Sequence, residues 1–139
     1  MKKLALLSFI FAVAACKPTI DPNAKKPLFE VLTVQTTGGG NIQFYEILTE
    51  EREIKMLQGD ENLKHKVKSG DTKTANFAIL NMGEKNSGGY SITIDKVEET
   101  ADNIVIYIKE NEPQGMATSV MTNPYTIIKI NSKKPILFK

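Results

Sequence analysis

The stretch GEKNSGGYSITI, residues 83–94, places a charged and polar run and two consecutive glycines directly before an alternating apolar segment. Within that segment Tyr90, Ile92 and Ile94 alternate with polar residues. Because successive side chains of a strand point to opposite faces, the pattern predicts a strand over residues 90–95 with one apolar face and one solvated face.

Apolar segments of strand length recur on both sides of this one. Residues 49–57 fit either a helix or a loop, and residues 60–67 predict a short helix with Asp60 capping its first turn. These elements predict a mostly β fold, with α+β as the alternative, built as an antiparallel sheet or sandwich with one or two short helices. The other predicted strands, separated by Gly, Pro, Asn and Asp, are 29–36, 41–48, 74–82, 103–110, 116–121 and 125–131.

Two local irregularities are also predicted. Val97 breaks the alternation of the strand that begins at Tyr90, which indicates a β-bulge near Asp95 and Lys96. The glycine triplet at 38–40 separates two strand-like segments, which favours a hairpin there.

The N-terminus, MKKLALLSFIFAVAAC, has the parts of an export signal: two lysines, an apolar run over residues 4–15 and small residues before Cys16. The apolar run is shorter than the ~20 residues that a transmembrane helix needs. Residues 13–16 resemble the lipobox of bacterial lipoproteins, in which the cysteine is acylated and becomes the first residue. The sequence therefore predicts a lipoprotein signal peptide over residues 1–15 and lipidation of Cys16.

Cys16 is the only cysteine of the chain, and lipidation explains why an exported protein carries a single thiol. Each buried methylene contributes ~0.8 kcal/mol, so two or three acyl chains would anchor the protein stably. We expect a bacterial cell-envelope protein held in the outer membrane, on its periplasmic or its surface face, because Lys17 follows the cysteine. Residues 16–27, with three of the six prolines, form a tether. Residues 28–139 form a single domain.

Charge and composition argue against several classes of function. Removal of residues 1–15 leaves 16 basic and 16 acidic residues, and such a neutral chain does not predict nucleic-acid binding. His65 is the only histidine, so a Ser-His-Asp set would have to use it, and a Cys-His pair is excluded within the domain. Metal-ligand spacings are absent from the sequence. We predict no enzymatic activity, no cofactor and no metal.

The glycine pair, Gly88 and Gly89, has two interpretations. In the first, the glycines only allow positive backbone angles in a connection between two antiparallel strands, one ending at Met82 and the next beginning at Tyr90. In the second, the connection over residues 83–89 also recognises another molecule, since it is longer than a two-residue hairpin loop needs to be. Both interpretations stay open on this argument.

The order of several motifs carries a family resemblance. Gly83 and then SGGY (87–90) precede the alternating strand, KENEP (109–113) ends an isoleucine-rich strand, and NPY (123–125) begins the last apolar strand. This order resembles the PrcB C-terminal domain family over about residues 75–131. The resemblance implies a lipoprotein subunit, not itself a protease, that a bacterial cell-surface protease complex needs for assembly and stability. Asn86 and Ser87 depart from the Pro-Thr that commonly precedes Gly-Gly-Tyr in the family.

A second resemblance uses the same loop. Asn86 to Tyr90 also resembles the Asn-Pro-Thr-Thr-Gly-Tyr loop of chagasin-type inhibitors of cysteine peptidases, which insert three loops into an enzyme cleft. Residues 123–125 stand where that family has Arg-Pro-Trp. The chain contains no tryptophan and lacks the Pro-Thr pair, so this inhibitor is the alternative.

The sequence thus predicts a lipid-anchored protein that binds another exported protein, with a protease as one candidate partner. Its oligomeric state and its partner's identity stay open. Tyrosine suits such a contact because it buries a large ring at low entropic cost. The predicted contact residues are Asn86, Ser87, Gly88, Gly89, Tyr90, Pro124 and Tyr125.

Overall fold

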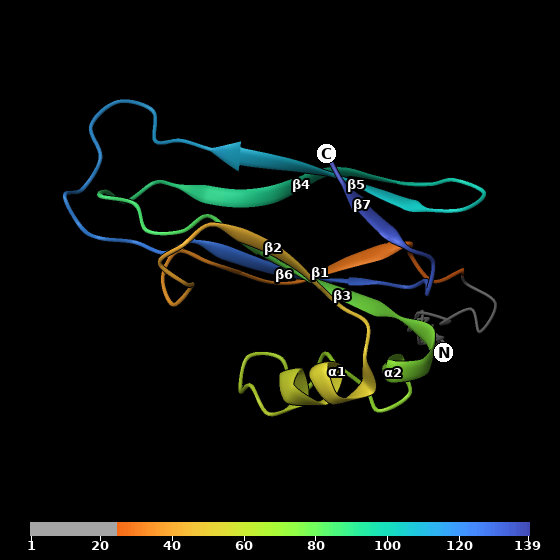
Figure 1. Cartoon of the computed structure of the whole chain (residues 1–139). Helices are drawn as coiled ribbons and strands as arrows, with labels where there is room; N and C mark the ends of the chain where they lie inside the picture. Colours follow the sequence, from red (N-terminus) through yellow and green to blue (C-terminus); the bar gives the residue numbers. More distant parts are fainter. Residues whose placement is uncertain (1–24) are drawn as a thin grey trace, which may run out of the picture.

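Two stacked β-sheets and a layer of short helices make up the domain (Figure 1). The computed structural model describes residues 25–139; the predicted signal peptide, Cys16 and most of the predicted tether lie outside the described residues. Sheet 1 has the strand order β1 (Phe29–Gln35), β6 (Tyr125–Ile130), β3 (Asn76–Asn81) and β2 (Phe44–Leu48). Sheet 2 has the order β4 (Ser91–Glu99), β5 (Ile104–Asn111) and β7 (Ile136–Phe138). The predicted mostly β fold is confirmed.

Sheet 1 is covered on both faces. Sheet 2 packs on one face, and α1 (Glu51–Gln58) and α2 (Asp71–Thr74) lie on the other (Figure 1). The central strand β6 shows the consequence, because Ile128 is buried in the cluster between the sheets while Ile127 is buried in the cluster beneath the helices. Such two-sided burial requires apolar residues at consecutive positions, and this explains the run of isoleucines in β6.

Sheet 2 is built on the antiparallel pair β4 and β5. Ile92, Ile104 and Ile106 point from these strands into the interior and are fully buried. The register shifts between Ile94 and Lys96, so the predicted bulge is confirmed. The strand β7 was not predicted, and it pairs with β5 in parallel, unlike the other strand pairs described.

The predicted hairpin at the glycine triplet is wrong. β1 pairs with β6 and β2 pairs with β3, which places β1 and β2 at opposite edges of sheet 1. The connection between β3 and β4 is not a hairpin either, since it crosses from sheet 1 to sheet 2. The glycine-containing segments therefore pass across the end of the sandwich and do not join neighbouring strands.

Two further local predictions need correction, and one ambiguous prediction is resolved. Residues 116–121 form an exposed loop and not a strand. Residues 60–67 form consecutive turns and not a helix, although the Asp60 carboxylate accepts the predicted kind of bond, from the amide of Asn62 at 2.7 Å. Residues 49–57, for which the sequence allowed either a helix or a loop, form most of α1. A capping box between Glu50 and Glu53 stabilises the first turn of this helix. No helix of residues 25–139 is long and apolar enough to cross a lipid bilayer.

A buried ion pair joins α2 to the centre of sheet 1. The ammonium of Lys129 lies 2.9 Å from the carboxylate of Asp71, and both side chains are almost fully buried. Burial by itself would raise the pKa of Asp71, but hydrogen bonds from the Lys68 amide and the Lys129 ammonium outweigh it and lower the pKa. The Asp71 carboxylate thus compensates the charge of Lys129, which would otherwise be buried in β6 without a close partner.

Replacing Asp71 by Asn should destabilise the domain by about 3–5 kcal/mol, because Lys129 keeps its charge but loses its main partner. Because the native pKa of Asp71 is lowered, its contribution is present above about pH 4 and is lost as the pH falls through the native pKa. Urea unfolding of both proteins between pH 7 and pH 3 measures this, and the difference between them should shrink in acid.

The matched control is Lys55→Ala, which removes an exposed ion pair with Glu51. This change should alter the free energy of unfolding by no more than about 0.5 kcal/mol. Equal losses for Asp71→Asn and Lys55→Ala would contradict the assigned role of the buried pair.

Candidate interaction site at the loop end

Three connections meet at the end of the sandwich that Figure 1 shows on the left. They are residues 36–43, 83–90 and 112–124, and we call them together the loop end. The first precedes β2, the second links β3 to β4, and the third links β5 to β6. Since these segments are far apart in sequence, their bonds to one another determine the shape of this end.

Asn81, the last residue of β3, ties the first connection to sheet 1. Its side chain is fully buried, its Nδ2 donates to the carbonyls of Gly40 (3.0 Å) and Ile42 (2.6 Å), and its Oδ1 accepts from the Gly40 amide (3.0 Å). A Cβ on Gly39 would lie 2.2 Å from that oxygen, so only glycine fits there. The Asn81 side chain thus fixes the backbone of residues 40 and 42 against the end of β3.

Hydrogen bonds also join the second and third connections. Lys85 and Thr122 exchange two backbone bonds, of 2.8 and 2.9 Å. The Thr122 hydroxyl donates to the carbonyl of Ser87 at 2.8 Å, and the Gly88 amide donates to the carbonyl of Thr118 at 2.9 Å. The backbone of the glycine loop is therefore held against residues 118–122.

The two glycines that precede Tyr90 have different roles. Gly89 has a φ of +86°, and a Cβ there would lie 2.7 Å from the Cβ of Pro113. Gly88 has no positive φ, and the nearest atom to a Cβ there is 3.8 Å away, on Thr118. Only Gly89 needs to be glycine for backbone reasons.

The predicted contact residues separate into different environments. Asn86 and Gly89 are exposed, and Ser87 and Gly88 are partly buried. Tyr90 is also partly buried: its ring packs against the cluster between the sheets, with the Lys85 ammonium 5.6 Å from the ring centroid.

Pro124 and Tyr125 lie at the same end of the sandwich as this loop, but they do not form one exposed surface with it. Pro124 is fully buried, so its ring is not available to a partner, and its carbonyl accepts the Met82 amide at 3.0 Å. Tyr125 packs on the helix-covered face of sheet 1, opposite to the face that Tyr90 contacts. Burial, and to a smaller extent Asp60, raises the pKa of the Tyr125 phenol.

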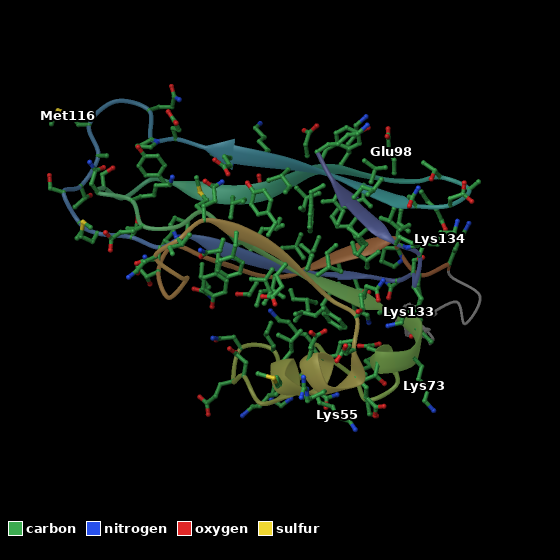
Figure 2. All side chains as sticks on the ribbon, viewed as in Figure 1. Lys55, Lys73, Glu98, Met116, Lys133 and Lys134 are labelled. Atoms are coloured by element: carbon green, nitrogen blue, oxygen red, sulfur yellow. The ribbon has the colours of Figure 1, made fainter. Side chains whose placement is uncertain are left out.

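Exposed apolar side chains at the loop end were missed at the sequence level. Met116 is completely exposed and projects outward in Figure 2, while Val120 and Met121 are about half exposed. Ile42, in the first connection, is 80% exposed. The segment 116–121 was assigned as a strand because it has strand length and lies between turn residues, and that assignment hid its exposed side chains.

The loop end exposes large apolar side chains and, within the described residues, contains no cluster of metal ligands. In residues 25–139, no group of three or more His, Cys, Asp or Glu side chains is arranged to hold a metal ion. The loop end instead presents backbone amides, glycines and large apolar side chains on a braced framework. Such surfaces with methionine and aliphatic side chains are typical of protein interfaces.

Comparison with known proteins supports the assignment of the central segment. Residues 77–131 match the family model described as PrcB C-terminal. The predicted family resemblance is confirmed for this segment. A stretch of 73 residues, 52% of the chain, is 33% identical to an uncharacterized protein of Methanocaldococcus jannaschii. The match covers 44% of that relative, so the chain spans less than half of its length. No solved structure matches the chain.

The PrcB C-terminal segment runs from β3 to β6 and contains the second and third connections of the loop end. It therefore includes the loop with Gly88 and Gly89, as well as Pro113 and Thr122. The matched segment does not include the first connection (36–43), the edge strands β1 and β2 of sheet 1, or α1.

Gly89→Ala should destabilise the domain by about 1–2 kcal/mol or more, because alanine disfavours the positive φ and its methyl group would meet Pro113. The neighbouring change Gly88→Ala should stay within about 0.5 kcal/mol of the wild type. Urea denaturation of the three proteins provides the comparison. Equal free energies of unfolding for the two variants would be inconsistent with the described loop geometry.

Proposed function

We propose that this PrcB-like protein is a non-catalytic, lipid-anchored component of the bacterial cell envelope that binds another exported protein through its loop end. The observation that carries this proposal is the exposure of Met116, Val120, Met121 and Ile42 on loops that hydrogen bonds hold in place. A braced surface loses little conformational entropy on binding, and exposed apolar groups supply the contact area.

The position of the first described residues supports this use of the loop end. The carbonyl of Pro27 accepts a hydrogen bond from Asn131 at 2.7 Å, and Asn131 directly follows β6. Tyr125, at the start of β6, lies at the loop end, so residues 25–28 lie at the other end of the sandwich (Figure 1). A lipid on Cys16 would then leave the loop end directed away from the membrane.

The family resemblance suggests the kind of partner. It implies a subunit that helps a cell-surface protease complex to assemble and remain stable, without being the protease. We propose an exported protein of such a complex as the partner, and the outer membrane as the location, on its periplasmic or its surface face.

Cys16→Ser should abolish anchoring, because serine cannot form the thioether that holds the acyl chains. Cells grown with radiolabelled palmitate should incorporate label into the wild type and into a Thr19→Ser control, but not into Cys16→Ser. In cell fractionation, the membrane fraction should contain the mature wild type but no mature form of the serine variant. Label in Cys16→Ser, or none in the wild type, would contradict the proposed anchor.

A double variant, Met116→Asp with Val120→Asp, should reduce crosslinking of the protein to its partner in intact cells by about tenfold, because it introduces charge at the centre of the proposed contact. Val31→Asp with Val34→Asp is the matched control, since these residues of β1 are about as exposed as Val120. Quantitative mass spectrometry of crosslinked products reports the yields. Equal yields for both double variants would exclude the loop end as the contact.

One observation also favours the alternative, a chagasin-like inhibitor of cysteine peptidases: three loops converge at one end of a sandwich. Titration of a papain-like peptidase with the full chain separates the two candidates. Inhibition that the Met116 and Val120 double variant weakens would support the inhibitor, whereas full peptidase activity leaves partner assembly as the proposal.

A further inference from the structure

The strand β2 is an open edge of sheet 1. It pairs with β3 on one side, and no strand of residues 25–139 pairs with its other side. Phe44, Tyr45 and Glu46 are all exposed. An edge strand presents unpaired backbone amides and carbonyls, and proteins usually protect such an edge with lysine, proline or a covering segment. β2 contains neither lysine nor proline.

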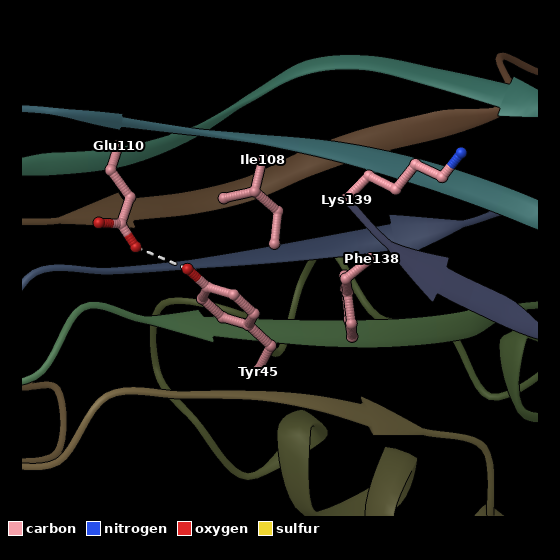
Figure 3. Close-up of a pocket in the computed structure, with 5 residues that line it drawn as sticks. All are labelled: Tyr45, Ile108, Glu110, Phe138 and Lys139. Carbon is pink, nitrogen blue, oxygen red and sulfur yellow. Dashed lines mark hydrogen bonds between the residues drawn. The ribbon is translucent and has the colours of Figure 1, made fainter.

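Hollows flank β2 on both faces of the sheet. Between the two sheets lies one of about 470 Å³, drawn in Figure 3, to which β2 contributes Tyr45. On the helix side lie two more, of about 340 and 240 Å³, to which β2 contributes Phe44 in one case and Glu46 and Leu48 in the other. Met56, Leu57 and Ile79 line both helix-side hollows, which are therefore adjacent.

These hollows follow the alternation of the strand. Phe44, Glu46 and Leu48 point toward the helix side, and Tyr45 points between the sheets. A strand added beside β2 would continue the pleat of sheet 1, so its side chains would reach the hollows of the two faces in turn. The backbone edge and the hollows thus fit the same occupant, an extended chain.

The charges around β2 specify the chemistry of that occupant. Carboxylates line the hollows, and Lys139 is the basic residue among them. None of these carboxylates forms a salt bridge within residues 25–139. The carboxylates are those of Glu46, Glu53, Asp60 and Glu110.

Glu110 occupies a defined position at the edge. It accepts 2.6 Å hydrogen bonds from the Tyr45 hydroxyl and from Nε2 of Gln43, which connects sheet 2 to β2 (Figure 3 shows the first). Burial, followed by the bond to Glu110, raises the pKa of Tyr45, so the phenol is neutral at physiological pH. Glu110 forms no salt bridge within residues 25–139, although Lys139 lines the same hollow.

A second copy of this chain is a poor occupant. Pairing of β2 with β2 of another copy about a two-fold axis would bring the two Glu46 side chains, and the neighbouring Glu53 side chains, near one another. Like charges opposed across a strand pair destabilise it. Lysine or arginine, in contrast, would find several carboxylates within reach.

We propose that β2 is a docking edge for an extended segment of another protein in which apolar side chains alternate with lysine or arginine. The segment adds as a fifth strand to sheet 1, so that its apolar side chains enter the hollow between the sheets that Ile108 and Phe138 line and its basic groups lie on the helix side near Glu46 and Glu53. This surface adjoins the loop end at residues 38–40, which line one of the helix-side hollows, but the proposal does not rest on the function proposed for the loop end.

The probe for this site is the synthetic heptapeptide acetyl-Lys-Val-Lys-Ile-Lys-Val-Lys-amide, with a control peptide in which Glu replaces Lys. Fluorescence anisotropy with the full chain measures affinity, and hydrogen–deuterium exchange locates the bound peptide. The lysine peptide should bind and slow amide exchange in residues 43–48, because an added strand protects the outward-facing amides. The glutamate peptide should bind at least about tenfold more weakly.

The variant Glu46→Lys should weaken binding of the lysine peptide by about tenfold or more. Asp95→Lys makes the same charge change at an exposed position of β4 and should keep the affinity within about twofold. The loop-end variant Met116→Asp with Val120→Asp should leave peptide binding unchanged, so that failure of one site is distinguishable from failure of the other.

Three outcomes would overturn the docking edge. The first is binding without slowed exchange in residues 43–48. The second is equal weakening of binding by Glu46→Lys and Asp95→Lys. The third is slowed exchange in β2 that grows with protein concentration in the absence of peptide, because that result would assign the edge to self-association.

Discussion

Burial of sheet 1 on both faces is the constraint on which the rest of the structure depends. Polar side chains inside β3 and β6 are shielded from solvent, and three of them bond to other parts of the domain. Thr126 donates to the Ile92 carbonyl in sheet 2, and Lys129 pairs with Asp71 of α2. The Asn81 side chain donates to the backbone of the first connection, residues 36–43. The few polar groups inside the sheet thus determine how sheet 2, the helices and the loop end attach to it.

The same constraint gives the loop end its rigidity. Asn81 anchors residues 36–43, and Thr122 bonds to the loop that contains the glycine pair. Apolar side chains such as Met116 are exposed on this framework without support from a core. Binding through such a surface would not require the protein to fold further, which is consistent with the proposed role in partner recognition.

The matched segment and the remainder of the chain contribute different parts of the molecule. Residues 77–131 supply the central strands β3 and β6, the pair β4 and β5, and two of the three connections at the loop end. Residues before 77 supply the glycine connection, the edge strand β2 and the helix α1. The loop end is therefore mainly a property of the family segment, whereas the hollows beside β2 depend on residues outside it.

The sequence by itself determined the strands at 90–95, 103–110 and 125–131 and the bulge near Asp95, because side-chain alternation is a local property of an extended chain. It also determined the loop over residues 83–89, but not that Gly89, and not Gly88, needs to be glycine. Only the tertiary structure decided which strands pair, that residues 116–121 remain a loop, and that Tyr90 and Tyr125 lie on opposite faces. Those outcomes depend on contacts between residues far apart in the chain, since an alternating segment becomes a strand only where a neighbouring edge accepts its hydrogen bonds.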